Sequence, residues 1–459
     1  MLFRSVRPDH LFVALRGTRE DGAKYVEDAI RRGAVAIVSE HNDWARRDIT
    51  HIRVEDARRA VAEIACAFHD HPSAQLEMIG VTGTNGKTTT TFMIRDILRA
   101  AGRNPGMIGT VMYEMGARCI PANRTTPEAP DLQSMLAQMV AAGCSSAVME
   151  VSSHALEQKR VWGIDFDVGV FTNLTRDHLD YHVTMERYFG AKTLLFRGLG
   201  QMEKRAAAVI NLDDAWGQQL ANTGGGWSSL VTYGMHPGAL VRAVNVELGP
   251  QGSTFTIDSP WGVVDVRLGL MGRYNVSNAL AAFAACATRG LRPDFIAGVL
   301  EGFQSAPGRL ERIPNARDLQ VYVDYAHTDD ALSNVLTTLR EVAPRKLIVV
   351  FGCGGDRDRS KRPRMGGVAG LLADFTVLTS DNPRSEDPCD ILDQIAEGMP
   401  GGARYERIPD REAAIARALE VARPGDVVLI AGKGHENYQE FARTVIPFDD
   451  REVARRLLA

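Results

Sequence analysis

Residues 76–100, LEMIGVTGTNGKTTTTFMIRDILRA, contain the pattern that decides the fold. An apolar run from Leu76 to Thr82 is followed by a glycine-rich turn and then by a helical pattern from Lys87 to Ala100. A buried strand, a glycine-rich turn and a helix in this order are the context of a phosphate-binding P-loop. The glycines let backbone N–H groups face phosphate oxygens, and the helix N-terminus adds its positive end.

The loop residues have separate roles in binding a nucleoside triphosphate. The Lys87 side chain would reach the β- and γ-phosphates, and the Thr88 hydroxyl would coordinate Mg²⁺. The general pattern has a glycine at position 81, where this chain has Val81. A glycine-rich turn with a chance Lys-Thr pair is the alternative interpretation. The expected ATP-binding residues of the loop are Gly83, Thr84, Asn85, Gly86, Lys87, Thr88 and Thr89.

Length and composition indicate a multidomain globular protein. The chain has 459 residues, more than one hydrophobic core usually supports. Its 53 Lys and Arg against 57 Asp and Glu argue against nonspecific binding to nucleic acid. No apolar run has the roughly 18 residues of a membrane span, and the six cysteines form no C-x-x-C pair. We therefore expect a cytoplasmic protein without a nucleic-acid or membrane partner.

Three blocks of pattern divide the chain. Residues 1–72 have short strand patterns and two helical patterns. Residues 73–306 have apolar strands such as Ala147–Glu150, which suit a mostly parallel sheet covered by helices. Residues 240–270 alternate and predict a small antiparallel patch, while residues 307–459 alternate strands with helices in a doubly wound pattern. The predicted fold class is therefore α/β in three domains.

Further motifs, in chain order, narrow the choice of family. They are MEVSSH (149–154), TNLTRDHLDYH (172–182), GRYNVSN (272–278), VDYAH (323–327), FGCGGDRD (351–358), DNPR (381–384) and AGKGHE (431–436). With the loop sequence TGTNGKT, these motifs resemble the Mur ligases and their folylpolyglutamate synthetase relatives. The resemblance covers nearly the whole chain.

The resemblance implies both an architecture and a reaction. The architecture is a partial N-terminal α/β UDP-binding domain (1–72), a central P-loop ATPase domain (73–306) and a C-terminal Rossmann-like domain (307–459). The reaction is an ATP-dependent, ADP-forming ligation in peptidoglycan precursor synthesis. It activates the D-Glu γ-carboxylate of UDP-MurNAc-L-Ala-D-Glu as an acyl phosphate, from which the amine of meso-diaminopimelate displaces phosphate. The implied partners are these small molecules and ATP, and the implied state is a monomer.

The groups of the first step are anionic, so charge neutralisation should dominate catalysis. Glu150 ends an apolar strand and can hold Mg²⁺, although a solvated strand-end acid is the alternative. By resemblance, His178 would also coordinate Mg²⁺, and Lys192 would be carbamylated by CO₂. A carbamate is an anionic oxygen ligand, whereas a helix lysine is usually a solvated ammonium. The implied catalytic residues are Lys87, Glu150, His178 and Lys192, and the implied metal ligands are Thr88, Glu150, His178 and carbamylated Lys192.

Four residues outside the loop would complete the nucleotide site. Asn275 and Asn278 lie three apart on one helical face, which suits an adenine edge, although helix N-capping is the alternative for Asn275. By resemblance, Arg309 would reach the γ-phosphate and Asp324 would accept the ribose hydroxyls. Both residues would reach the nucleotide only when the C-terminal domain closes on the central domain.

The DNPR tetrapeptide bears on the choice of amino acid. An arginine suits a bidentate contact to a carboxylate, and meso-diaminopimelate has a distal carboxylate that lysine lacks. Arg384 therefore favours diaminopimelate, while lysine or another diamino acid is the alternative. The implied contacts to diaminopimelate are Arg357, Asp381, Asn382, Pro383, Arg384, Gly432 and Glu436.

The UDP-linked substrate has a separate set of expected contacts. By resemblance these are Thr125, Thr126, Ser152, Gln158 and Arg160, while Arg124 stands where many relatives have asparagine. Relatives carry roughly twenty more residues at the N-terminus. They also have Asp-Ser-Arg where this chain has Leu2-Phe3-Arg4, so Phe3 replaces a serine that contacts uridine.

Two other function classes compete with a ligase. A P-loop phosphotransferase or nucleotide switch would explain the loop but not the tetrapeptide that ends in Arg384. An inactive paralogue would fit the short N-terminus, but Lys87, Glu150, His178 and Lys192 are all present.

Overall fold

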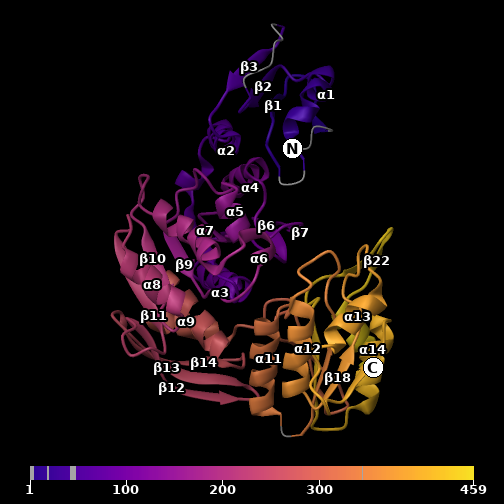
Figure 1. Ribbon diagram of the computed structural model, residues 1–459. Helices are drawn as coiled ribbons and strands as arrows, with labels where there is room; N and C mark the ends of the chain where they lie inside the picture. The colour runs from indigo at the N-terminus through magenta and orange to yellow at the C-terminus, as the bar shows by residue number, and fades with distance from the viewer. Residues whose placement is uncertain (1–4, 18–19, 42–47, 344) are drawn as a thin grey trace.

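The computed structural model describes residues 5–17, 20–41, 48–343 and 345–459 (Figure 1). These residues form three α/β parts with separate main sheets. The first part lies at the top of Figure 1, the second on the left and the third at the lower right. In the described parts of the chain, no helix is both long and apolar enough to cross a membrane.

The first part is a small parallel sheet with one helix packed on it. Its strands, in the order β1-β2-β3, are β1 (Leu11–Val13), β2 (Ala36–Ser39) and β3 (Thr50–Arg53). The helical segments are η2 (Gly22–Tyr25), α1 (Val26–Arg31) and α2 (Ala57–Phe68). Val26 and Ala29 of α1 pack against Phe12 and Ile37 of the sheet. Asp56 caps α2, which leads into the second part.

The second part is built on an eleven-stranded sheet. Its strands are β4 (Glu77–Thr82), β5 (Pro105–Ile108), β6 (Met112–Met115), β7 (Arg118–Pro121), β8 (Ser146–Glu150), β9 (Val168–Phe171), β10 (Ala207–Asn211), β11 (Ser229–Gly234), β12 (Val241–Gly249), β13 (Gly252–Ser259) and β14 (Gly262–Leu268). The order is β14-β13-β12-β11-β10-β9-β4-β8-β5-β6-β7. The central strands β11, β10, β9, β4, β8 and β5 are parallel. Antiparallel strands extend the sheet at both edges.

Helices cover both faces of this sheet. They are η3 (Pro72–Gln75), α3 (Lys87–Ala100), α4 (Ala129–Ala141), α5 (Ser153–Glu157), α6 (Leu179–His182), α7 (Met185–Gly198), α8 (Ala215–Thr223), α9 (Arg273–Ala287) and α10 (Pro293–Glu301). Ile79 and Val81 of β4 pack on the face covered by α3, α9 and α10. Met78 of the same strand packs on the face covered by α4 and α7, because successive residues of a strand point to opposite faces.

The third part is a six-stranded sheet in the order β15-β16-β20-β17-β18-β19. Its strands are β15 (Glu311–Ile313), β16 (Gln320–Asp324), β17 (Leu347–Phe351), β18 (Phe375–Leu378), β19 (Tyr405–Arg407) and β20 (Val427–Ala431). Its helices are α11 (Asp329–Val342), α12 (Lys361–Leu372), α13 (Pro388–Ala396), α14 (Arg411–Val421) and α15 (Asp450–Leu458). All strands except β15 are parallel, as the doubly wound prediction requires. A separate hairpin of β21 (Tyr438–Phe441) and β22 (Thr444–Pro447) follows β20.

The predicted strand, loop and helix around residue 84 are confirmed. Strand β4 runs into a loop, and α3 begins at Lys87 as expected. Val81 of β4 pairs with Glu150 of β8, and Thr82 pairs with Phe171 of β9. The carboxyl ends of three parallel strands therefore meet beside the loop, which is where open α/β sheets bind ligands.

The predicted antiparallel patch is confirmed. Strands β12–β14 are antiparallel, and they belong to the eleven-stranded sheet. Tyr233 of β11 pairs in parallel with Val241 of β12, which joins the three strands to the main sheet. That pairing depends on a tertiary contact that the alternating pattern alone does not reveal.

Candidate active site

The phosphate loop fits tightly against its neighbours. Gly83 and Gly86 have φ angles of +152° and +86°, which favour glycine. A Cβ on Gly83 would lie 1.8 Å from the Thr172 hydroxyl oxygen, and one on Gly86 would lie 2.3 Å from Oδ1 of Asn278. Only glycine fits at these two positions. The Lys87 ammonium turns back over the loop and donates to the carbonyls of Gly83 and Thr84 at 3.0 and 2.8 Å.

Glu150 is buried beside the start of α3, with 1% of its surface exposed. Its carboxylate accepts hydrogen bonds from the Thr88 hydroxyl at 3.0 Å, the Thr110 N–H at 2.8 Å and the Thr110 hydroxyl at 3.0 Å. Among the described residues, no side chain forms an ion pair with Glu150. The alternative of a solvated strand-end acid is therefore wrong. A buried carboxylate without a bonded cation, next to a P-loop threonine, has the chemistry of a Mg²⁺ ligand.

Lys192 is buried in α7, with 1% of its surface exposed, so it is not a solvated helix lysine. Its Nζ donates to the Gly83 carbonyl at 2.7 Å and lies 4.6 Å from the ring centre of Tyr188. Burial, and secondly the positive charge of Lys87, lower the pKa of Lys192 well below its usual range. The amine is therefore disposed to be neutral.

His178 lies at the N-terminus of α6 with a φ of +54°. Its ring centre is 4.9 Å from that of His154 and 6.0 Å from that of Tyr188. Desolvation lowers the pKa of His178, against the attraction of Asp177, which favours the neutral imidazole that binds metals. The Tyr188 hydroxyl is 3.1 Å from the Thr84 hydroxyl of the loop.

The structure brings the four expected catalytic residues to one loop. Lys87 and Lys192 both contact Gly83, and Glu150 contacts Thr88. The His178 ring lies edge-on to the ring of Tyr188. The Tyr188 hydroxyl in turn contacts Thr84 of the loop. No three His, Cys, Asp or Glu side chains of the described residues form a ready metal site. A metal here would therefore need oxygen ligands from a substrate phosphate or from a modified Lys192.

Arg309 reaches the nucleotide loop, and Asp324 lies next to the segment that carries Arg309. Arg309 donates from Nη2 to the Thr88 hydroxyl at 3.0 Å, and its guanidinium lies 4.6 Å from the ring centre of Tyr325. Asp324 ends β16 and is largely buried. It accepts from the Leu310 N–H at 2.6 Å, and burial raises the pKa of its carboxyl.

The two asparagines lie where α9 faces the loop. The N-cap of α9 is Gly272, so the alternative of Asn275 as an N-cap is wrong. The Asn275 amide donates to the Met271 carbonyl at 2.9 Å, and the Asn278 amide donates to Oδ1 of Asn275 at 3.1 Å. Asn278 lies against Gly86, so the pair is next to the loop.

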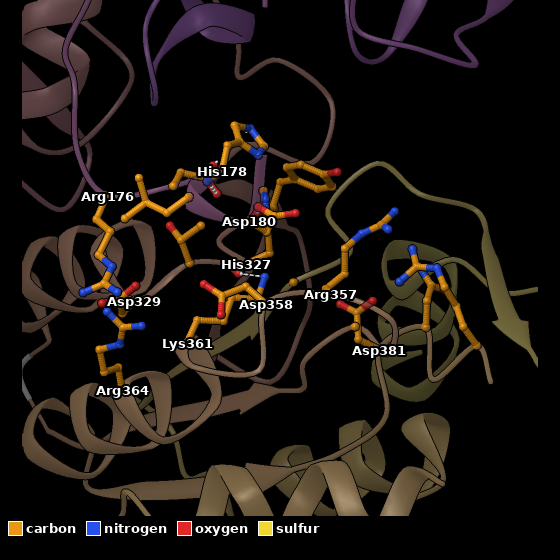
Figure 2. A pocket seen from close by; sticks show the side chains of 18 of the residues that line it. Arg176, His178, Asp180, His327, Asp329, Arg357, Asp358, Lys361, Arg364 and Asp381 are labelled. Atoms are coloured by element: carbon orange, nitrogen blue, oxygen red, sulfur yellow. Dashed lines mark hydrogen bonds and ion pairs between the residues drawn. The ribbon is translucent and has the colours of Figure 1, made fainter. Parts of the chain in front are cut away.

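A cleft of about 560 Å³ lies between the second and third parts (Figure 2). One wall is the loop before α6 with His178, and the facing wall belongs to the third part. The lining residues expected to contact diaminopimelate are Arg357, Asp381, Asn382, Arg384, Gly432 and Glu436. Pro383 is not among the residues that line the cleft.

The polar groups at one end of this cleft bind one another closely. The Asn382 amide donates to Oε2 of Glu436 at 2.9 Å. Lys433, which sequence reasoning did not assign, is fully buried and donates to Oδ1 of Asn382 at 3.1 Å and to Oε2 of Glu436 at 3.0 Å. Its only sequence signal was its place in the AGKGHE motif.

The residues expected to contact the UDP-linked substrate form a second cluster beside Glu150. The Thr126 hydroxyl donates to the Glu150 carbonyl at 2.8 Å and accepts from the Ser152 N–H at 3.1 Å. Arg160 donates to the Thr126 carbonyl at 3.0 Å and also binds Oε1 of Gln158. Thr125 and Thr110 have hydroxyls 3.1 Å apart. The Arg124 side chain instead pairs with Glu128, and Phe3 lies outside the described residues.

Sequence reasoning also missed a contact from the third part to the nucleotide loop. Oδ2 of Asp330, in α11, accepts from the Asn85 amide at 2.8 Å and from the Thr175 hydroxyl at 2.9 Å. Asp330 belongs to no motif, so it gave no signal before the parts were placed together.

Known proteins share this arrangement along nearly the whole chain. A UDP-N-acetylmuramoyl-L-alanyl-D-glutamate–2,6-diaminopimelate ligase from Geobacter metallireducens is 47% identical over 98% of this chain and 91% of its own length. An equally named ligase from Geobacillus thermodenitrificans is 48% identical over 98% of this chain and 92% of its own length. The chain belongs to the Mur ligase family. Mur ligases are ATP-dependent, ADP-forming ligases.

Family models and solved structures agree with this membership. Three Mur ligase models match: the family's catalytic domain at residues 4–69, the middle domain at 81–286 and the glutamate ligase domain at 308–434. A solved UDP-N-acetylmuramoyl-L-alanyl-D-glutamate–2,6-diaminopimelate ligase has a TM-score of 0.70 and 35% identity, covering 99% of this Mur ligase and 93% of its own chain. MurF from Thermotoga maritima, solved with ADP, has a TM-score of 0.66 at 20% identity, covers 99% of this chain and 95% of its own, and shares the fold.

Proposed function

We propose that this Mur ligase joins meso-diaminopimelate to the D-Glu γ-carboxylate of UDP-MurNAc-L-Ala-D-Glu while ATP becomes ADP and phosphate. Its three domains would span residues 1–72, 73–306 and 307–459, and it would act as a cytoplasmic monomer. One observation supports diaminopimelate as the amino-acid substrate: Arg384 lines the same cleft as His178. An arginine there fits the distal carboxylate that distinguishes diaminopimelate from lysine.

The nucleotide would bind across the loop at the end of β4. Lys87 and the backbone N–H groups of the loop would hold the phosphates, as in other P-loops. Arg309 already contacts Thr88, so its charge is within reach of a phosphate bound there. Asn275 and Asn278 would lie near the base, and Asp324 near the ribose. The concentration of positive charge favours the first step, in which a carboxylate oxygen attacks the γ-phosphorus.

The residues present fit Mg²⁺ at Thr88 and Glu150. The Thr88 hydroxyl and the buried Glu150 carboxylate are 3.0 Å apart, and both are oxygen ligands of the kind that Mg²⁺ prefers. When bound, Mg²⁺ would offset the negative charge of the phosphates and the carboxylate. His178 and Lys192 would hold a second metal ion.

Lys192 fits this second position only as a carbamate. Its amine is buried and its pKa is lowered by burial and by Lys87, so the neutral form that reacts with CO₂ is favoured. The nitrogen bonds to the carbon of CO₂ and loses a proton, which leaves an anionic carbamate. This anion would balance the charge of Lys87 beside it and supply oxygen ligands.

The diamino acid would bind at the end of the cleft formed by the third part. Arg384 and Arg357 would face its carboxylates, while Glu436, with Asp381 beside it, would face its distal ammonium group. The other amine would then point toward the nucleotide loop, where the activated carboxylate is formed. It attacks the acyl carbon, and the bond from that carbon to the phosphate oxygen breaks.

The acidic substrate would bind beside Glu150. Thr126 holds the backbone at Glu150 and Ser152 together, so a ligand at Ser152 lies next to the catalytic carboxylate. Arg160 and Gln158 face the same region and offer charged and amide donors to the peptide part of the substrate.

A phosphate-release assay tests the proposed function. Purified enzyme is given ATP and Mg²⁺ with the UDP-dipeptide, with diaminopimelate, with both or with neither. The proposal predicts sustained phosphate release only when both are present, in equal amount to the tripeptide product. Release that needs neither substrate would instead indicate a nucleotide hydrolase or switch, and no release in any mixture would indicate an inactive paralogue.

A further inference from the structure

Arg384 has an uncommon backbone conformation. Its φ is +53°, in the left-handed region that residues other than glycine rarely occupy. It ends the DNPR segment after β18, and its side chain lines the cleft between the second and third parts. Non-glycine residues keep such a conformation where neighbouring groups hold it in place, and they cluster at ligand sites. The groups that hold Arg384 therefore bear on what its side chain binds.

One residue of the β21 strand holds Arg384 at two points. The Glu440 carbonyl accepts from the Arg384 backbone N–H at 3.0 Å, and Oε2 of the Glu440 carboxylate accepts from Nε of Arg384 at 2.9 Å. The Glu440 backbone N–H donates to Oδ1 of Asn382 at 3.0 Å. Glu440 thus fixes the main chain of the tetrapeptide through its backbone, and the direction of the guanidinium through its side chain.

Hydrogen bonds within the described residues use only some of the N–H donors of the Arg384 side chain. An arginine has five N–H donors. Nε is taken by Glu440, and Nη1 donates once, to the Gly355 carbonyl at 2.7 Å. Within the described residues, Nη2 makes no hydrogen bond. The guanidinium is therefore held by one edge, and its terminal nitrogens are left for a ligand.

We propose that Glu440 is a positioning residue for diaminopimelate. Its carboxylate fixes the Arg384 side chain so that the terminal nitrogens meet the distal carboxylate of the diamino acid. This inference rests on the function proposed above. A guanidinium that is already immobilised loses less side-chain freedom when the substrate binds, so the carboxylate of Glu440 should tighten binding.

The structure separates this role from a role in folding. Only the carboxylate of Glu440 depends on the residue type, because its other two contacts are made by the backbone. The Glu440 side chain is 40% exposed, so its substitution leaves no buried void. Glu412 gives a matched control: it pairs with Arg456 at 2.8 Å on the same domain and does not line the cleft.

The test compares Glu440→Ala, Glu440→Gln and Glu412→Ala in steady-state ligation. Glu440→Ala should raise the KM for diaminopimelate roughly three- to tenfold, with the KM for ATP and kcat within about twofold of the parent. Glu440→Gln keeps an oxygen that accepts from Nε, so its KM should stay within about twofold. Glu412→Ala should change neither KM.

A second variant separates positioning from a general effect on the domain. In an Arg384→Ala background, adding Glu440→Ala should raise the KM no further, because the group that Glu440 positions is gone. An unchanged or lower KM for diaminopimelate in Glu440→Ala would overturn the proposal, and so would an equal rise in both backgrounds. If the parent enzyme makes no product with diaminopimelate, the proposed function fails and this role fails with it. An active parent with an unaffected Glu440→Ala variant refutes the role of Glu440 alone.

Discussion

Lys87 and Lys192 donate to the same carbonyl oxygen, that of Gly83, at 3.0 and 2.7 Å. Two ammonium groups bound to one carbonyl oxygen repel each other strongly, and Lys192 is buried. Lys192 has its pKa lowered well below the usual range, first by burial and then by Lys87. This geometry therefore favours a charged Lys87 at the phosphate loop and a neutral Lys192. The neutral amine is the form that reacts with CO₂.

Lys192→Ala should lose ligase activity on the order of 100-fold or more, because the anionic oxygen ligand that the carbamate would supply to a metal ion is removed. Acetate or a similar small acid should restore part of the activity by occupying the space that the side chain leaves. The measurement is the ligation rate with and without added acid. Full activity of Lys192→Ala without any acid would contradict the role assigned to this residue.

Arg384→Ala should raise the KM for diaminopimelate roughly 10- to 100-fold, since a charged hydrogen bond to the substrate is lost. The KM for ATP should change far less, because none of the loop residues 83–89 lines the cleft that holds Arg384. Separate titrations of the two substrates measure this difference. An equal rise in both values would show that Arg384 supports the fold and not the amino acid.

Asp330 should contribute to ATP binding from the third part of the chain. Asp330→Ala removes the acceptor of the Asn85 amide, so the KM for ATP should rise about two- to tenfold. Asn334→Ala is the matched control, because Asn334 lies one turn further along α11 and also donates to Asp330. If both variants have the same KM for ATP as the parent, the contact does not assist nucleotide binding.

Glu386 should make stability depend on pH in acid. It pairs with the fully buried Arg362 at 2.9 Å, and hydrogen bonding from Arg362 lowers the pKa of Glu386 from 4.5 to about 2. The folded state thus favours the charged carboxylate, and this stabilisation is complete above pH 4.5 and is lost as the pH falls toward 2. Glu386→Gln should lower the free energy of unfolding by about 3 kcal/mol at pH 7, since it leaves a buried charge without its partner.

Thermal unfolding at several pH values checks this prediction. The difference in Tm between Glu386→Gln and the parent should be largest near neutral pH and should shrink below pH 4.5. Glu420→Gln is a suitable control because Glu420 is 71% exposed and pairs with Arg417 at the surface. A difference for Glu386→Gln that stays constant from pH 7 to pH 3 would show that lost packing, and not charge, causes the destabilisation.

The central fold could be predicted from the sequence because local signals agreed with the final packing. Helix α3 begins at Lys87 and ends at Ala100, as its pattern predicted. The apolar strands β4, β8 and β9 lie side by side in the main sheet, as their buried pattern indicated. The β21–β22 hairpin was missed because its residues, 438–447, are mostly exposed and have no strong apolar pattern.

The candidate site was predictable where a motif placed its residues at the end of a strand. Glu150 follows this rule, and so does the DNPR segment after β18. Asp330 and Glu440 could not be found in advance, because their contacts join segments far apart in the chain and depend on tertiary packing.

A competition among amino acids tests directly whether this enzyme selects diaminopimelate. The enzyme is given ATP, Mg²⁺ and the UDP-dipeptide with equal amounts of meso-diaminopimelate, lysine and ornithine, and the products are separated by mass. The diaminopimelate adduct should dominate, in equal amount to the ADP formed. A lysine or ornithine adduct formed at the same rate would contradict the assignment of Arg384 to the distal carboxylate.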